Sequence, residues 1–230
     1  MLFKIVKRLK KIGISIQGNY LGINSQKYWD LRFNSNWELQ NGKIQTMLFA
    51  AGFISSKFAK TITPLKILDY GCGLGDSIPI LRMAFPESEI SFYDFSNVAM
   101  EKAKKEYSDL AKPLDLKSPK KYELVYCSNV IEHITDSGLI EFVNLLTKFS
   151  SKHVVIQAPF DERLPDGSKI SPLAKSNEIE HERTIDSTFI GFLAEKWPQY
   201  KWTEETMKIP RAWDMGLQIF FIGTKLHATS

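Results

Sequence analysis

The segment ILDYGCGLGD at residues 67–76 joins a short apolar run to a turn with glycine at alternate positions. Because glycine has no Cβ, such a turn can be tight and can let a ligand approach the backbone. A helix is expected to follow, since Asp76 or Ser77 can cap its N-terminus and Pro79 falls in its first turn, where a missing N–H costs little. The segment therefore predicts a strand, a glycine turn and a helix in succession.

Apolar runs and helical patterns alternate along most of the remaining chain. Strands are expected at residues 67–70, 89–94, 113–116, 122–127, 153–158, 203–209 and 217–223, and helices at about 77–84, 97–107, 137–149 and 187–196. Ser96 is expected to cap the second of these helices. The alternation predicts an α/β fold with a doubly wound, mostly parallel, Rossmann-like sheet of seven strands, in which ligands bind at the carboxyl ends of the strands.

Composition and charge divide the chain into three parts. Residues 1–24 are expected to form a basic amphipathic tip and a linker, residues 25–60 an aromatic-rich helical lid, and residues 61–230 the main α/β domain. The first 13 residues hold five Lys or Arg and no acid, whereas the rest holds 25 basic and 26 acidic residues. Residues 1–13 could lie on an anionic membrane surface or dock on protein. A nucleic-acid partner is not expected, because the positive charge is not spread over a face of the domain.

The cysteine content and hydropathy indicate a compartment. Cys72 and Cys127 are the two cysteines of the chain, and this small number predicts free thiols and a reducing, cytoplasmic location. No run of 18 apolar residues occurs, so no membrane-spanning segment is predicted. If the tip binds a membrane, the protein would be peripheral to its inner face.

Two carboxylates flank the glycine turn. Asp69 directly precedes it, and Asp94 lies 19 residues after Gly75, at the end of the next predicted strand. A carboxylate at the second position can accept two hydrogen bonds from a ribose diol. A dinucleotide-binding turn would have its third glycine at the position of Asp76, which is a poor neighbour for a pyrophosphate. Together the residues indicate an adenosine-type ligand with a cationic end, although each one alone could be an ordinary turn glycine or strand-end acid.

Three motifs carry a resemblance to a known family. ILDYGCGLGD, FYDFS and YELVYCSNVIEHI, within residues 66–160, resemble class I S-adenosylmethionine-dependent methyltransferases, most closely the small-molecule O-methyltransferases of ubiquinone biosynthesis and sugar modification. The resemblance implies that S-adenosylmethionine is the cofactor, that Asp94 holds its ribose and that Phe95 flanks its adenine. It also implies a backbone contact from Ser128 and, as the best match in a compressed segment, an adenine contact from Asp115. The glycines expected to wrap the methionine part are Gly71, Gly73 and Gly75.

The run Tyr-Trp-Asp-Leu-Arg-Phe at residues 28–33 is similar to the N-terminal lids of related methyltransferases. The resemblance implies that Trp29 covers the cofactor and that Arg32 meets its carboxylate. The alternative is that Trp29, Phe33 and Trp37 only anchor a packed helix.

Two histidines are candidate catalytic residues. An oxygen acceptor usually loses a proton during methyl transfer, and histidine is a natural base near neutral pH. The resemblance places the pair Glu132 and His133 near the acceptor, and His181 at the acceptor mouth. The pair could instead only stabilise the loop that follows. Glu132, His133, His181 and Glu182 are suitable metal ligands, but their spacing matches no known cage, so no metal is predicted.

A polar excursion at residues 159–184 is expected to overhang the acceptor pocket. Its mixed charges favour a sugar or a polar headgroup, so the predicted function is O-methyl transfer to a sugar or a lipid-linked glycan precursor. One alternative is a non-catalytic S-adenosylmethionine-binding partner protein. Another is a nicotinamide-dependent oxidoreductase, which Asp76 and the antiparallel-looking strands within residues 203–223 disfavour.

Overall fold

The computed structural model describes residues 23–35, 37–117, 120–171, 180–211 and 216–226. The predicted basic tip at residues 1–13 lies outside these residues. The helices are α2 (Gln26–Ser35), α3 (Gly42–Ser55), α4 (Ile78–Ala84), α5 (Asn97–Tyr107), α6 (Asp136–Phe149) and α7 (Phe189–Lys196). Three short 3₁₀ turns are η1 (Glu38–Gln40), η2 (Ala59–Thr61) and η3 (Ile131–His133).

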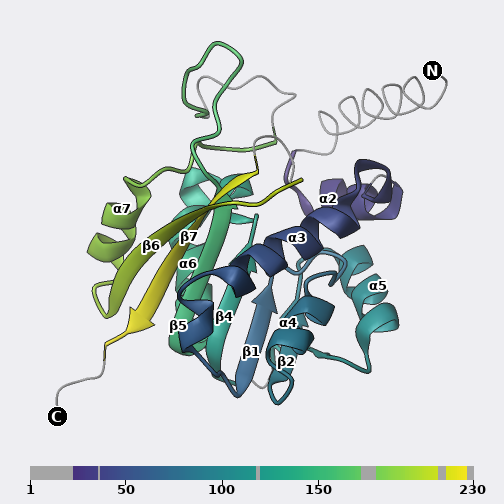
Figure 1. Ribbon diagram of the computed structural model, residues 1–230. Helices are drawn as coiled ribbons and strands as arrows, with labels where there is room; N and C mark the ends of the chain where they lie inside the picture. The colour runs from purple at the N-terminus through teal and green to yellow at the C-terminus, as the bar shows by residue number, and fades with distance from the viewer. Residues whose placement is uncertain (1–22, 36, 118–119, 172–179, 212–215, 227–230) are drawn as a thin grey trace.

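Seven strands form one twisted sheet in the described part of the chain (Figure 1). They are β1 (Lys66–Tyr70), β2 (Glu89–Tyr93), β3 (Lys112–Pro113), β4 (Tyr122–Ser128), β5 (Ser150–Pro159), β6 (Tyr200–Lys208) and β7 (Leu217–Lys225). Their order is β3-β2-β1-β4-β5-β7-β6. The first five run parallel, and β7 pairs antiparallel with both β5 and β6. The predicted seven-stranded, mostly parallel fold is confirmed.

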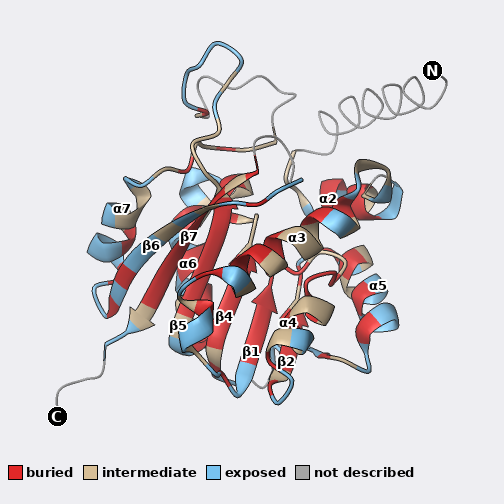
Figure 2. Cartoon of the chain, in the orientation of Figure 1, coloured by how far each residue is buried: buried red, intermediate tan, exposed pale blue. Residues whose placement is uncertain are grey.

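Helices cover both faces of the sheet, and side chains of successive strand residues point to opposite faces. In β4, Val125 and Cys127 pack with α6 and α7, whereas Leu124 and Tyr126 pack with α3, α4 and α5. Figure 2 shows the central strands buried along most of their length. A chain with apolar residues on both sheet faces must cover both, and this requirement produces the doubly wound arrangement.

The predicted lid at residues 25–60 divides into two parts. Helix α3 buries Phe49 and Phe53 in the same cluster as the sheet, and the Phe53 ring stacks on Tyr126 with 4.8 Å between centroids. Helix α2 instead forms a small separate cluster in which Trp29 and Phe33 pack with α5. Helices α2 and α3 therefore pack in different clusters of the domain.

Two predicted helix caps had different outcomes. The Ser96 Oγ accepts a hydrogen bond from Ala99 N–H at 3.1 Å, which confirms this residue as the cap of α5. Ser77 occupies the N-cap position of α4, as predicted, but neither Asp76 nor Ser77 provides a side-chain capping hydrogen bond. The Ser77 backbone already has helical torsion angles, so its hydroxyl donates to Asp69 instead, and Asp76 accepts from the Tyr107 hydroxyl at 2.8 Å.

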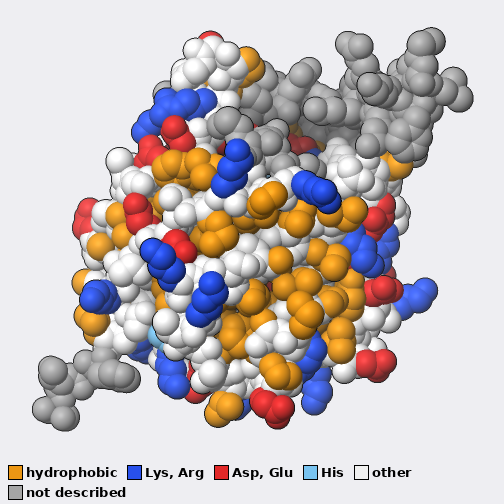
Figure 3. Space-filling view, in the orientation of Figure 1, with side chains coloured by type: hydrophobic (Ala, Val, Ile, Leu, Met, Phe, Trp, Pro, Cys, Tyr) orange, Lys and Arg blue, Asp and Glu red, His pale blue; other side chains and the backbone are white. Residues whose placement is uncertain are grey.

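The surface combines apolar and charged side chains. Hydrophobic side chains gather over α3 and α4 on the face in Figure 3, and Ile44 and Met83 are among the exposed ones. Lysine and arginine side chains are interspersed with acidic ones on this face. In the described residues, no helix has the length and apolar character needed to cross a membrane.

Candidate active site

A cavity of about 960 Å³ opens at the carboxyl ends of the parallel strands. It lies where the strand order reverses between β1 and β4, the usual ligand position in open α/β sheets. Its walls come from four strand ends and the start of β7, with the glycine turn, α2 and the excursion after β5 completing it. Segments distant in sequence therefore meet around one space.

The glycine turn after β1 forms one wall. Gly71, Gly73 and Gly75 all have positive φ angles of 80°, 54° and 82°, a region that side chains disfavour. A Cβ on Gly71 would also lie 2.5 Å from a methyl group of Val130. Gly71 and Gly73 line the cavity, but Gly75 packs against Tyr107 and lies outside the lining.

Asp94 ties the end of β2 to the glycine turn. Its two carboxylate oxygens accept hydrogen bonds from Gly73 N–H and Ser96 N–H, both at 2.9 Å. The carboxyl group is buried, and burial raises its pKa to about 6 even though these bonds favour the charged form. Asp94 lines the cavity together with the exposed Phe95, so its remaining lone pairs can accept from a ligand.

Asp69 lies behind the turn rather than on the cavity wall. It is 2% exposed and accepts a hydrogen bond from the Ser77 hydroxyl. Burial, with a smaller contribution from the negative charge of Asp94, raises the pKa of Asp69 to about 7, although the hydrogen bond from Ser77 lowers it. The turn thus has two buried acidic groups close enough to repel each other.

Helix α2 is anchored to the β2–α5 junction. Asp30 accepts from the Ser96 hydroxyl at 2.5 Å and from Val98 N–H at 3.2 Å. The Gln26 amide donates to the Phe95 carbonyl at 2.7 Å. These bonds orient the helix so that Trp29, Arg32 and Phe33 line the cavity.

Arg32 is buried between aromatic rings and an acid. Its guanidinium carbon lies 5.3 Å from the Trp29 ring centroid and 6.0 Å from that of Trp37. The guanidinium pairs with Glu180 and donates to Gln40 at 2.9 Å. Its Nε–H is buried and has no acceptor in the described part of the chain. Sequence reasoning missed Glu180, whose position depends on the folded excursion.

His133 and His181 also line the cavity. The His133 ring contacts Trp29 edge to face at 4.9 Å and His181 at 4.7 Å between centroids. His181 Nδ1 is hydrogen-bonded to the Glu162 carboxylate. Burial lowers the pKa of His181, but the hydrogen bond and the nearby charges of Glu132 and Glu162 outweigh burial, and the pKa is raised overall. Burial raises the pKa of Glu132 to about 7.

Backbone contacts bring the two histidines together. The Glu182 N–H donates to the Glu132 carbonyl at 2.6 Å, and the Arg183 side chain donates to the Ile134 carbonyl. Arg183 also pairs with Asp136 at 2.9 Å. The end of the excursion is therefore fixed against η3.

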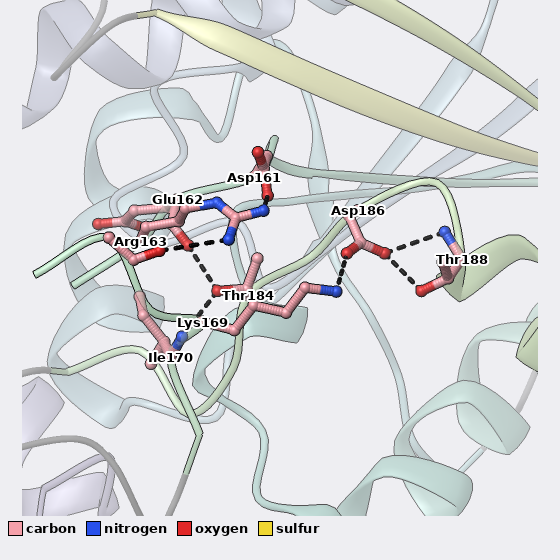
Figure 4. Close-up of polar contacts among 9 residues, drawn as sticks. Asp161, Glu162, Arg163, Lys169, Ile170, Thr184, Asp186 and Thr188 are labelled. Carbon is pink, nitrogen blue, oxygen red and sulfur yellow. Dashed lines mark hydrogen bonds and ion pairs between the residues drawn. The ribbon is translucent and has the colours of Figure 1, made fainter.

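The described parts of the excursion, residues 159–171 and 180–184, are joined by polar contacts (Figure 4). The Thr184 hydroxyl donates to the Glu162 carbonyl at 2.5 Å and accepts from Ile170 N–H at 2.8 Å. Lys169 pairs with Asp186 at 2.5 Å. The contact with Thr184 holds the backbone of Glu162, whose carboxylate is hydrogen-bonded to His181.

Most of the predicted site residues line one cavity. Those in its lining are Trp29, Arg32, Gly71, Gly73, Asp94, Phe95, Ser128, His133 and His181. Asp69 and Gly75 support the turn from behind. Asp115 is exposed outside the lining and accepts from Lys117 N–H at 2.9 Å, so its predicted contact with adenine stays a prediction. Sequence reasoning gave no role to Glu162 and Glu180, nor to Asp30, although Asp30 lies within the quoted run at residues 28–33.

Solved structures with this fold are numerous. BpumL, described as a plantazolicin methyltransferase and solved with SAH and a monoazolic desmethylPZN analog, aligns with a TM-score of 0.61 and 14% identity over 99% of this chain and 100% of its own. Magnesium protoporphyrin IX methyltransferase (ChlM) from Synechocystis PCC 6803, with bound SAM, aligns with a TM-score of 0.58 and 14% identity. The alignment covers 93% of this chain and 97% of ChlM. A putative O-methyltransferase from Nostoc punctiforme PCC 73102 aligns with a TM-score of 0.62 and 12% identity. The alignment covers 98% of this chain and 70% of the Nostoc protein. These likenesses define the class I methyltransferase fold.

A family model adds sequence evidence to the fold. Residues 68–148 match the model described as a methyltransferase domain. No curated protein matches the chain in sequence. The chain therefore has the fold of class I S-adenosylmethionine-dependent methyltransferases, and its residues 68–148 carry the sequence match to a methyltransferase domain.

Proposed function

We propose that the chain methylates a small polar acceptor and binds S-adenosylmethionine at the glycine turn. The observation that carries the proposal is one cavity whose lining includes Gly71, Gly73, Asp94 and two histidines. Its volume of about 960 Å³ is at the upper end of ordinary ligand pockets, so it has room for a cofactor and a small acceptor. The cofactor supplies the methyl group on a positively charged sulfur.

The β2 side of the cavity would hold the adenosine half. Asp94 would accept the ribose hydroxyls, and the ring of Phe95, 46% exposed at the cavity, would flank the adenine. Ser128, at the end of β4, would contribute a backbone contact. Asp69 would act from behind the turn, because its charge and that of Asp94 together favour a cationic ligand.

Helix α2 would cover the methionine half as a lid. The buried Arg32 Nε–H without an acceptor suits a carboxylate, which supports the proposed contact with the cofactor carboxylate. Trp29 lies beside this group and would exclude water from the reacting atoms. We accordingly propose residues 1–24 as tip and linker, residues 25–60 as the helical lid segment and residues 61–230 as the catalytic domain.

The acceptor would lie against the histidine wall. Glu132, Glu162, Glu180 and both histidines give this side of the cavity polar groups that can bind hydroxyls. A sugar or a lipid-linked glycan precursor fits that chemistry. The similar structures include a plantazolicin methyltransferase with a desmethylPZN analog and a magnesium protoporphyrin IX methyltransferase, so the acceptor differs widely within this fold.

His133 and His181 are the proposed catalytic residues. Both line the acceptor end of the cavity, where the acceptor hydroxyl must lose its proton. The Glu162 carboxylate orients His181 and so fixes which ring nitrogen faces the cavity.

The proposal is tested by binding and transfer measured on the same variants. Calorimetry with the wild-type chain is expected to show S-adenosylhomocysteine binding and no NAD binding. His181→Gln is expected to lower the methyl-transfer rate on hydroxylated acceptors by about 100-fold, because it removes a group positioned at the acceptor. Its affinity for S-adenosylhomocysteine should stay within about twofold of the wild type.

His153→Gln is the matched control. His153 lies on β5, bonds to Thr224 at 3.1 Å and lies outside the cavity lining, so its replacement should leave the transfer rate unchanged. The cofactor assignment would be refuted if the wild-type chain bound NAD or did not bind S-adenosylhomocysteine. Equal transfer rates in the wild type and His181→Gln would refute the catalytic role.

We also propose a cytoplasmic enzyme that contacts the inner membrane face through residues 1–13. The support is the five basic residues and the amphipathic pattern of this segment. Full-length chain is expected to float with anionic vesicles, and a chain lacking residues 1–13 is expected to stay in the dense fraction. Equal flotation of the two would remove the membrane contact.

A further inference from the structure

The acceptor wall holds three potential metal ligands. Glu132, His133 and His181 each offer one ligand atom, and these atoms lie within 4.8 Å of one another. The first two belong to η3, and His181 belongs to the end of the excursion. Their spacing in sequence gives no sign of this cluster, because the excursion between them only folds back in the tertiary structure.

Glu132 provides a second, independent observation. The residue is 2% exposed, and its Oε2 atom is buried without a hydrogen-bond partner in the described residues. A buried carboxylate oxygen without a donor is costly. Two other acids, Glu162 and Glu180, also line this side, and Arg32 is already paired with Glu180. A cation next to this oxygen would satisfy it.

The surroundings of His181 suit metal ligation. Its Nδ1 is hydrogen-bonded to Glu162, which leaves Nε2 for an ion. Histidine ligands in proteins usually have their other ring nitrogen bonded to a carboxylate in this way. The contacts of Glu182 and Arg183 with η3 and the residue after it fix His181 relative to Glu132 and His133.

We propose that Glu132, His133 and His181 bind a divalent first-row transition metal ion at the acceptor end of the cavity. Two imidazoles and one carboxylate with open positions are a ligand set that such ions favour. The sequence alone predicted no metal, because it does not show these side chains converging. The inference rests on the proposed methyl transfer for its chemistry, but the binding itself does not depend on it.

The ion would position and activate the acceptor oxygen at an open coordination site. A bound hydroxyl has a lowered pKa, so its proton passes to water and its electron pair stays on oxygen. That pair forms the new bond to the methyl carbon, while the bond between carbon and sulfur breaks with its electrons going to sulfur. The histidines would then act through the ion rather than as free bases.

Cobalt binding to the full-length chain tests the proposal directly. After removal of metals with EDTA, the wild type is expected to bind one Co²⁺ per chain with a visible absorption band typical of nitrogen ligands, and Zn²⁺ should displace it. Glu132→Gln should lower the affinity for Co²⁺ at least about tenfold, because it replaces a ligand. Glu162→Gln should lower this affinity by about tenfold, because it removes only the partner of the ligand His181. His153→Gln should bind Co²⁺ like the wild type.

S-adenosylhomocysteine binding, measured on every variant, separates this proposal from the function. If the wild type binds S-adenosylhomocysteine but no Co²⁺, the metal site alone is refuted. If Glu132→Gln binds S-adenosylhomocysteine and also binds Co²⁺ as tightly as the wild type, the ligand assignment is refuted. If Co²⁺ binds as expected without S-adenosylhomocysteine binding, the metal site stands and the cofactor assignment fails.

Discussion

Replacing Asp94 by alanine is expected to weaken S-adenosylhomocysteine binding by at least about 100-fold. A carboxylate that accepts two ribose hydroxyls contributes about 1.5–3 kcal/mol per hydrogen bond, and each 1.4 kcal/mol is about tenfold in affinity. In the wild type, Asp94 also accepts hydrogen bonds from the Gly73 and Ser96 N–H groups. The variant removes this acceptor, so the turn loses its fixed geometry. Calorimetry with S-adenosylhomocysteine measures the effect.

Two further variants make this result specific. Asp94→Asn keeps the shape and one acceptor oxygen, so its affinity should fall less than that of Asp94→Ala. Asp109→Ala removes an exposed acid just after α5 and should change nothing. Thermal unfolding of each variant shows whether the fold is intact. A folded Asp94→Ala chain with wild-type affinity would contradict the ribose assignment.

Asp69→Asn is expected to change how stability depends on pH. Burial raises the pKa of Asp69 to about 7, above its ordinary value of 3.8, so the folded state binds more protons than the unfolded state between these values. Stability contributed by the protonated group is fully present below pH 3.8 and is lost as the pH rises through about 7. At about 1.4 kcal/mol per pKa unit, we expect a loss of roughly 2–4 kcal/mol.

Asparagine stays neutral and can still accept from Ser77, so the variant should avoid this loss. Denaturant unfolding at pH 4 should give similar free energies of unfolding for the two proteins. At pH 8 the variant without ligand should be more stable than the wild type by roughly 2–4 kcal/mol. A constant difference between the two proteins across this pH range would show that Asp69 does not titrate as the structure indicates.

Local features of the chain were predictable because they depend on residues near in sequence. The strand, glycine turn and helix at residues 66–84 follow from apolar alternation and from glycine at positions with positive φ. The cap at Ser96 follows from the hydroxyl's reach to a nearby N–H group. The short β3 was harder to predict, since Lys112–Pro113 offers only two pairing residues and no apolar pattern.

The sequence motifs marked the glycine turn, Asp94 and the two histidines, but not the acids that contact Arg32 and His181. Gly71, Gly73 and Asp94 follow strand ends that the parallel topology brings to one edge, so sequence pattern was sufficient to predict them. The partners Glu162 and Glu180 come from an excursion without periodicity. Their positions depend on Thr184, Arg183 and the backbone of η3, which only long-range contacts establish.

The sequence by itself determined that this chain forms a doubly wound α/β sheet with a carboxylate-flanked glycine turn, because hydrophobic periodicity and backbone freedom are local properties. Only the tertiary structure decided that Arg32 pairs with Glu180 and that Glu132, His133 and His181 converge. Contacts between residues tens of positions apart depend on how the excursion folds back over the sheet edge. No short-range pattern encodes that path.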